Sequence, residues 1–175
     1  MTTRLVAVGF LSLTLALGAA ACGGSDEDPA AQYASDVCTS LSDWKTDLEN
    51  TVQGVSSDLG SLSVDKVREA VDSARESTTN LLDDLRGLGA PETESGDQAK
   101  QEVDDLADSL EERADRLRDA ADSGSLVSIA SSVTTEVQGA TQDVNQTLTE
   151  LRQLEPGVDL KEAFQNDENC QSLND

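Results

Sequence analysis

The sequence contains no histidine, and aromatic residues make up only 2% of its 175 residues. The lack of histidine removes the commonest general base and the commonest metal ligand. Neither a G-x-S-x-G motif nor an EF-hand loop is present, so we predict no catalytic residue, no metal site and no cofactor. With so few aromatic rings, valine, leucine and alanine must fill the core, and these side chains suit narrow seams between helices.

Basic residues are also scarce. Twelve lysines and arginines stand against 35 aspartates and glutamates, which gives a formal net charge of −23. A surface this acidic repels the phosphates of nucleic acids and anionic lipid headgroups, so we expect no nucleic-acid partner. High net charge with few aromatic residues is also typical of disorder, and the apolar periodicity described below is the argument against it.

The N-terminus has the pattern of an export signal. Arg4 precedes an apolar run over residues 5–21, which ends in the small residues Gly-Ala-Ala-Ala. This pattern predicts a cleaved signal peptide over residues 1–21 and an extracytoplasmic location. The alternative is a transmembrane helix, because a run of this length could just span a bilayer, but no basic stop follows it.

Cys22 follows these small residues directly. The arrangement resembles the lipobox of bacterial lipoproteins, and the N-terminus as a whole looks like those of small actinobacterial lipoproteins. The resemblance implies a lipid on the Cys22 thiol, cleavage just before it and a membrane anchor. The family usually has leucine three places before the cysteine, where this chain has Ala19. Residues 19–21 also fit the A-x-A rule of ordinary signal peptidase, which would release a soluble protein.

The number of cysteines bears on this choice. An exported chain usually has an even number of cysteines, whereas this one has three. If Cys22 carries lipid, Cys38 and Cys170 remain to form a disulfide, which persists in an oxidising compartment. We predict that bridge, the alternative being two unrelated buried thiols. Residues 22–31, rich in glycine and acidic side chains, would form a flexible tether to the membrane.

Four amphipathic segments fill residues 32–155. Their apolar residues recur at alternating spacings of three and four, which places them on one helix face. The predicted helices are residues 32–59, 63–88, 94–122 and 125–154. Short connections make successive helices antiparallel neighbours. The prediction is an all-α, up-down-up-down four-helix bundle; a dimeric coiled coil and a partly disordered chain are the alternatives.

The periodicity also predicts burial and the path of the tail. The side chains expected to be buried are those of Val71, Leu81, Leu106 and Val137, and those expected to be exposed are Asp83, Glu112 and Arg116. In an up-down-up-down bundle the fourth helix ends beside the start of the first. The tail, residues 156–175, would place a short helix there and bring Cys170 to Cys38.

Small residues on the seams allow two interpretations. They are Ala74, Thr78, Ala114 and Ala140. They could leave a slot for an apolar ligand or let the helices approach closely, and close approach is the expectation. Trp44 and Tyr33 share a helix face, and core packing is the role expected for both.

Two functions are consistent with these features. The leading hypothesis is a non-enzymatic envelope lipoprotein, an acidic helical module that is held to the membrane by lipid and contacts an unknown envelope protein. The competing hypothesis is a module that holds a small hydrophobic or cationic ligand in the bundle. An exposed apolar stripe would favour a protein partner, and an apolar cavity would favour a ligand.

Overall fold

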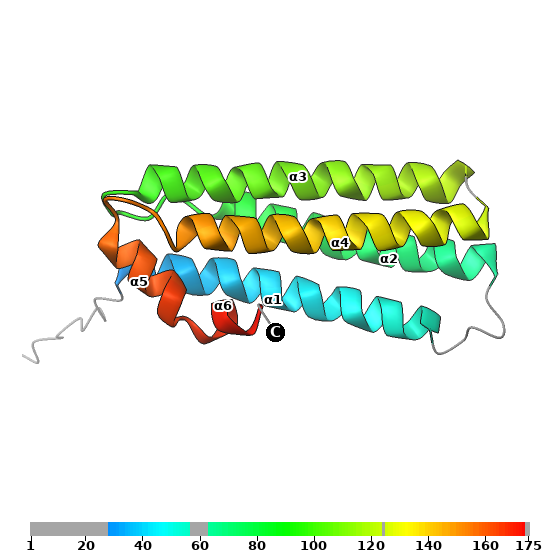
Figure 1. The fold of residues 1–175 in the computed structure, drawn as a ribbon, viewed down its shortest axis with the longest axis horizontal. Helices are drawn as coiled ribbons and strands as arrows, with labels where there is room; N and C mark the ends of the chain where they lie inside the picture. Colours follow the sequence, from blue (N-terminus) through cyan, green and yellow to red (C-terminus); the bar gives the residue numbers. More distant parts are fainter. Residues whose placement is uncertain (1–27, 57–62, 124, 174–175) are drawn as a thin grey trace, which may run out of the picture.

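The computed structural model describes residues 28–56, 63–123 and 125–173. It confirms an all-α fold in which four long helices pack side by side (Figure 1). The elements are α1 Pro29–Ser56, α2 Val64–Gly87, α3 Gly96–Ser123, α4 Leu126–Leu151, α5 Val158–Asn166 and α6 Glu168–Ser172. Within the described residues the four predicted helices are therefore present in the predicted order.

The helix starts follow from polar caps. The Asp28 carboxylate accepts a hydrogen bond from the backbone of Ala30, and Pro29 occupies the first helical position, where its missing N–H costs nothing. Helix α1 therefore begins three residues earlier than predicted, so residues 29–31 belong to the bundle and not to the tether. Ser63 caps α2 and Ser125 caps α4 through their side-chain oxygens, as their sequence positions suggest.

The apolar core is divided into two clusters. The larger one contains residues of α1 to α6, among them the fully buried Leu41, Leu85 and Phe164. The smaller one contains Val67, Val71, Leu117, Ala121 and Ile129 and has no member from α1. Figure 1 shows α1 running away from α4 toward its Ser56 end, which agrees with this division.

Most of the predicted exposure pattern is confirmed. Val71, Leu81 and Leu106 are buried, whereas Asp83, Glu112 and Arg116 are exposed. Val137 is an exception, because it is half-buried and lines an open groove between the helices. The prediction of full burial was wrong there because the pattern identifies the inward face of a helix without showing what lies opposite.

The tail adds two short helices where the sequence predicted one. Leu160 and Phe164 of α5 are fully buried, and both α5 and α6 pack against α1 near its first turns (Figure 1). Long helix α4 packs mainly against α3 and has little direct contact with α1. The first and fourth helices are thus joined at one end through the tail and separate toward the other end.

Candidate functional site

The predicted disulfide partners are brought together. Cys38 and Cys170 are bonded to each other across 132 positions of sequence, with their Cα atoms 5.0 Å apart, and both are fully buried. The fourth helix does return to the end where the first begins, which is the topology on which this prediction depended. Cys22, the predicted lipidation site, lies outside the described residues.

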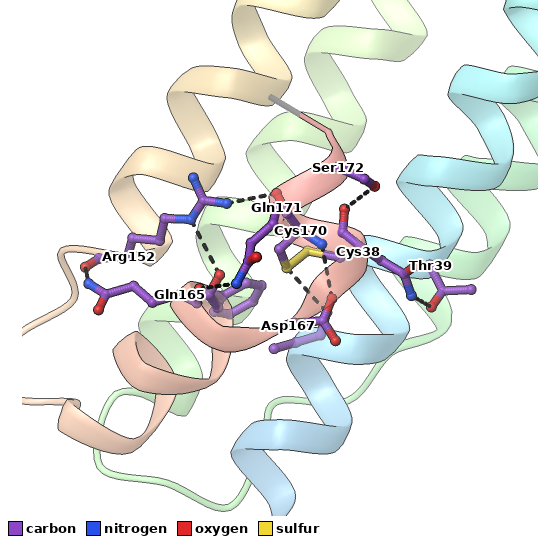
Figure 2. Close-up of a disulfide and its surroundings, with 11 residues drawn as sticks. Cys38, Thr39, Arg152, Gln165, Asp167, Cys170, Gln171 and Ser172 are labelled. Atoms are coloured by element: carbon purple, nitrogen blue, oxygen red, sulfur yellow. Dashed lines mark hydrogen bonds between the residues drawn. A yellow bond between two sulfur atoms is a disulfide. The ribbon is translucent and has the colours of Figure 1, made fainter. Parts of the chain in front are cut away.

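Polar contacts hold the tail in place around the bridge (Figure 2). Arg152 donates from its guanidinium to the carbonyl oxygens of Cys170, at 2.8 Å, and Phe164, at 3.3 Å. Asp167 caps α6 by accepting from the Cys170 N–H at 2.9 Å. Asp167 also lies beside both sulfur atoms, but a disulfide has no thiolate to offer a metal. The chemistry of this cluster is therefore structural.

A network of ion pairs that the sequence did not predict joins α3 to α4. The Arg113 guanidinium donates to both Asp143 oxygens, at 2.6 and 3.0 Å, and to Glu136 at 3.3 Å. Arg116 donates to Glu136 at 3.1 Å and also forms an exposed ion pair with Glu112 at 3.7 Å. The nearest sequence signal is Gly139 in the middle of α4, where a Cβ would lie 1.8 Å from Arg113 Nη1.

These contacts shift the pKa of both carboxyls. The hydrogen bonds from Arg113 hold the pKa of Asp143 below its usual value, and those from Arg116 lower the pKa of Glu136. A carboxyl with a lowered pKa stabilises the folded state at neutral pH, and this contribution is lost as the pH falls through the lowered value. All four charged groups are used within the network, so their arrangement is that of a structural clamp.

An apolar groove of about 540 Å³ lies in the described part of the molecule. It lies between the two core clusters and is lined by side chains from all four long helices. Its aliphatic lining includes Leu48 and Val52 of α1, Val67 and Val71 of α2, Leu110 and Leu117 of α3, and Val133 and Val137 of α4. Its position follows from the separation of α1 from α4.

The small seam residues help to form this groove. Ala74, Thr78, Ala114 and Ala140 all line it, so the slot that was the second interpretation of these residues is present. Short side chains on facing helices leave volume between the backbones when no longer side chain fills it. Trp44 is buried as expected and donates its indole N–H to the Thr78 hydroxyl at 3.1 Å, but its ring also lines the groove.

Large apolar side chains are exposed along the same groove. Among the described residues, Val52, Leu126 and Val127 are exposed by 48%, 36% and 81%, and all three line the groove. Isolated exposed apolar side chains are ordinary, but a contiguous set around a hollow marks a surface that another molecule covers.

Three of the lining residues carry charge: Arg75, Arg113 and Glu136. Arg113 and Glu136 are paired with each other and with their neighbours, as described above. The residues that line the groove do not include a nucleophile together with a free base, and nucleophilic catalysis needs both. The charged side chains of the groove are thus Arg75 and two members of the ion-pair network.

Comparison with protein families, with characterised proteins and with solved structures found no match to this chain. None of the described helices combines the length and the apolar character needed to cross a bilayer.

Proposed function

We propose that this chain is an exported, lipid-anchored protein that binds a small apolar molecule in the groove between its four long helices and does not transform it. The observation that carries the proposal is the groove itself, whose volume of about 540 Å³ falls within the roughly 300–1,000 Å³ of small-molecule sites. This is the competing hypothesis from the sequence, and it now takes the first place.

Burial of apolar surface would supply the free energy of binding. Each Å² of apolar surface taken from water contributes about 25 cal/mol, and the groove presents aliphatic side chains from four helices in one connected hollow. The two core clusters on either side of it contain many fully buried residues. An apolar molecule in the groove would join them into one continuous core, and binding would therefore stabilise the fold.

Binding can be tested with the single tryptophan as the reporter. Trp44 is the chain's only tryptophan and lines the groove, so an apolar ligand such as dodecanol should change its fluorescence saturably. The full chain with Cys22→Ser is the protein to use, because its own acyl chains are then absent. Ala114→Phe, which fills the groove, should weaken binding by at least about tenfold, the effect of losing roughly 1.4 kcal/mol.

The matched control is Ala120→Phe. Ala120 lies on the same helix and is also half-buried, but it does not line the groove. Circular dichroism should confirm that both variants fold. A wild-type chain that shows no saturable binding, or equal weakening by the two substitutions, would contradict the proposed function.

The membrane anchor is a separate part of the proposal. It is supported by the lipobox-like residues before Cys22 and by the bonding of Cys38 to Cys170, which leaves Cys22 as the cysteine outside this bridge. Two acyl chains on one residue would hold the protein stably, whereas one chain gives marginal binding. Cys22→Ser should release the protein into the medium or leave it unprocessed. Wild-type protein found soluble, with an unmodified Cys22 at its N-terminus, would contradict the anchor.

A second candidate function is the acidic interaction module, in which an envelope protein is the partner. The exposure of Val127, at 81%, favours it, because a partner's apolar side chains could cover this end of the groove. A photo-cross-linking residue at position 127, used in the intact envelope, separates the two candidates. A single protein adduct would support the interaction module, and its absence beside saturable binding of dodecanol would support the ligand.

A further inference from the structure

Arg75 differs from the other arginines of the described chain. Six of them have a hydrogen-bond or ion-pair partner for the guanidinium: Arg68, Arg86, Arg113, Arg116, Arg118 and Arg152. The guanidinium of Arg75 has none among the described residues, although the chain carries 35 acidic side chains. Arg75 is half-buried and lines the apolar groove.

A guanidinium that is partly withdrawn from water without a partner incurs a desolvation cost, which a hydrogen-bonding group on a ligand would offset. Arginine packs its aliphatic stem along apolar surface and keeps its charged head toward water. With the stem against the groove, the head is within reach of a polar group at the end of a molecule that fills the groove. Arginine binds a carboxylate through two parallel N–H···O bonds, a geometry that gives both energy and orientation.

The dimensions of the groove suit one alkyl chain. On α2 its lining extends from Val67 to Thr78, which is about 17 Å at 1.5 Å per residue. A groove of this length and of about 540 Å³ has room for an extended alkyl chain. The lining is aliphatic apart from Trp44 and the few polar residues, so it offers little ring surface on which a flat aromatic ligand could stack.

Building on the proposed function, we propose that the ligand is a single-chain fatty acid, whose alkyl chain lies in the groove and whose carboxylate pairs with Arg75. The charge balance selects a carboxylate over a phosphate monoester. One unpaired guanidinium neutralises one negative charge, whereas a phosphate monoester carries about −1.5 to −2 at neutral pH. The excess would remain beside a protein of net charge −23, which repels it.

The test compares three ligands that differ in the head alone: dodecanoate, dodecanol and dodecyl phosphate, each below its micelle concentration. They are titrated into the full chain with Cys22→Ser, and Trp44 fluorescence reports binding. The chain that keeps Arg75 should bind dodecanoate roughly 10- to 100-fold more tightly than dodecanol, which is the effect of a charge-assisted hydrogen bond. Dodecyl phosphate should bind more weakly than dodecanoate.

Substitution then assigns the preference to Arg75. Arg75→Gln should bring dodecanoate and dodecanol to within about threefold of each other, because the guanidinium that distinguishes the two heads is then absent. Arg118→Gln removes the same charge from an exposed position outside the groove and should keep the preference. Arg75→Lys should keep part of it, and this variant decides the matter if Arg75→Gln does not fold.

The outcomes separate this inference from the proposed function. If none of the three ligands binds, the proposed function is wrong. If dodecanol binds as tightly as dodecanoate, the groove binds apolar molecules but the carboxylate assignment is overturned. Tighter binding of dodecyl phosphate, or a preference that survives Arg75→Gln, would also overturn it.

Discussion

Arg113 and Gly139 show how a single glycine can serve a contact between helices. Gly139 lies inside α4, where glycine costs about 1 kcal/mol relative to alanine. Its missing side chain leaves room for the Arg113 guanidinium, which crosses from α3 to reach Asp143 and Glu136. The cost in helix propensity is offset by charge-assisted hydrogen bonds, each of which contributes about 1.5–3 kcal/mol.

Gly139→Ala should therefore destabilise the protein, although the same change in an open helix position stabilises. The new Cβ would lie 1.8 Å from Arg113 Nη1, so the guanidinium must leave its partners. In an Arg113→Met background the substitution should instead stabilise by up to about 1 kcal/mol, because only helix propensity remains. Urea unfolding of the four proteins gives the coupling free energy.

Gly54→Ala is the matched control for this experiment. A Cβ at position 54 of α1 would meet no atom within 4 Å, so alanine should stabilise there in either background. Equal effects of Gly139→Ala with and without Arg113 would show that the glycine does not serve the ion pairs.

At the scale of helices, the sequence predicted the features that depend on the residue pattern along one helix. Spacings of three and four residues identified the inward faces of α1 to α4, and the starts predicted at residues 63 and 125 coincide with the caps of α2 and α4. Pattern along one helix carries no information on the distance to the next helix. The side chains of Ala74 and Ala114 fit close approach and an open slot equally well, so the slot could not be predicted from them.

The disulfide could be predicted because topology restricts it. An even number of antiparallel helices returns the chain to the end where it began, and the cysteine count left one pair to be joined. The Arg113 network could not be predicted in this way. Its members are charged residues beside the seams, and the spacing of apolar residues does not show which charged residue of α3 faces which one of α4.

The bridge between the tail and α1 should contribute strongly to stability. Replacing Cys38 and Cys170 together by alanine removes a cross-link across 132 residues, which contributes up to about 5 kcal/mol in the chain-entropy model. The change should appear as a lower midpoint in urea unfolding. The helices α5 and α6 should stay docked, because Leu160 and Phe164 are fully buried and Arg152 binds the tail without help from the sulfurs.

Hydrogen exchange of residues 158–172 tests the second half of this expectation. Protection retained in the double variant would show that packing holds the tail and that the bridge acts mainly on the unfolded chain. An unchanged urea midpoint would contradict the role assigned to the bridge.

At the scale of the whole molecule, charge works against the fold. Acidic side chains outnumber basic ones by 23, and this excess is held close together when the chain is compact, so self-repulsion destabilises the folded state. The exposed ion pairs, such as Arg86 with Asp108 and Glu111, oppose it weakly, because each contributes about 0–1 kcal/mol. The pairs of Arg113 with Asp143 and Glu136 are partly buried and are screened less by salt.

Added salt should therefore stabilise this protein. Between 0.01 M and 1 M NaCl the screening length falls from about 30 Å to about 3 Å, which removes long-range repulsion across the surface while short pairs persist in part. The melting temperature of the Cys22→Ser chain, followed by circular dichroism, should rise over this range.

Two exposed substitutions that change the net charge in opposite directions distinguish screening of charge repulsion from salting-out of apolar surface. Glu69→Gln should raise the melting temperature at low salt and flatten its dependence on salt. Arg118→Gln should lower the melting temperature at low salt and steepen that dependence. Salting-out acts alike on both variants, so parallel curves of melting temperature against salt would show that net charge is not the cause. A melting temperature that falls with added salt would mean that the ion pairs outweigh the repulsion.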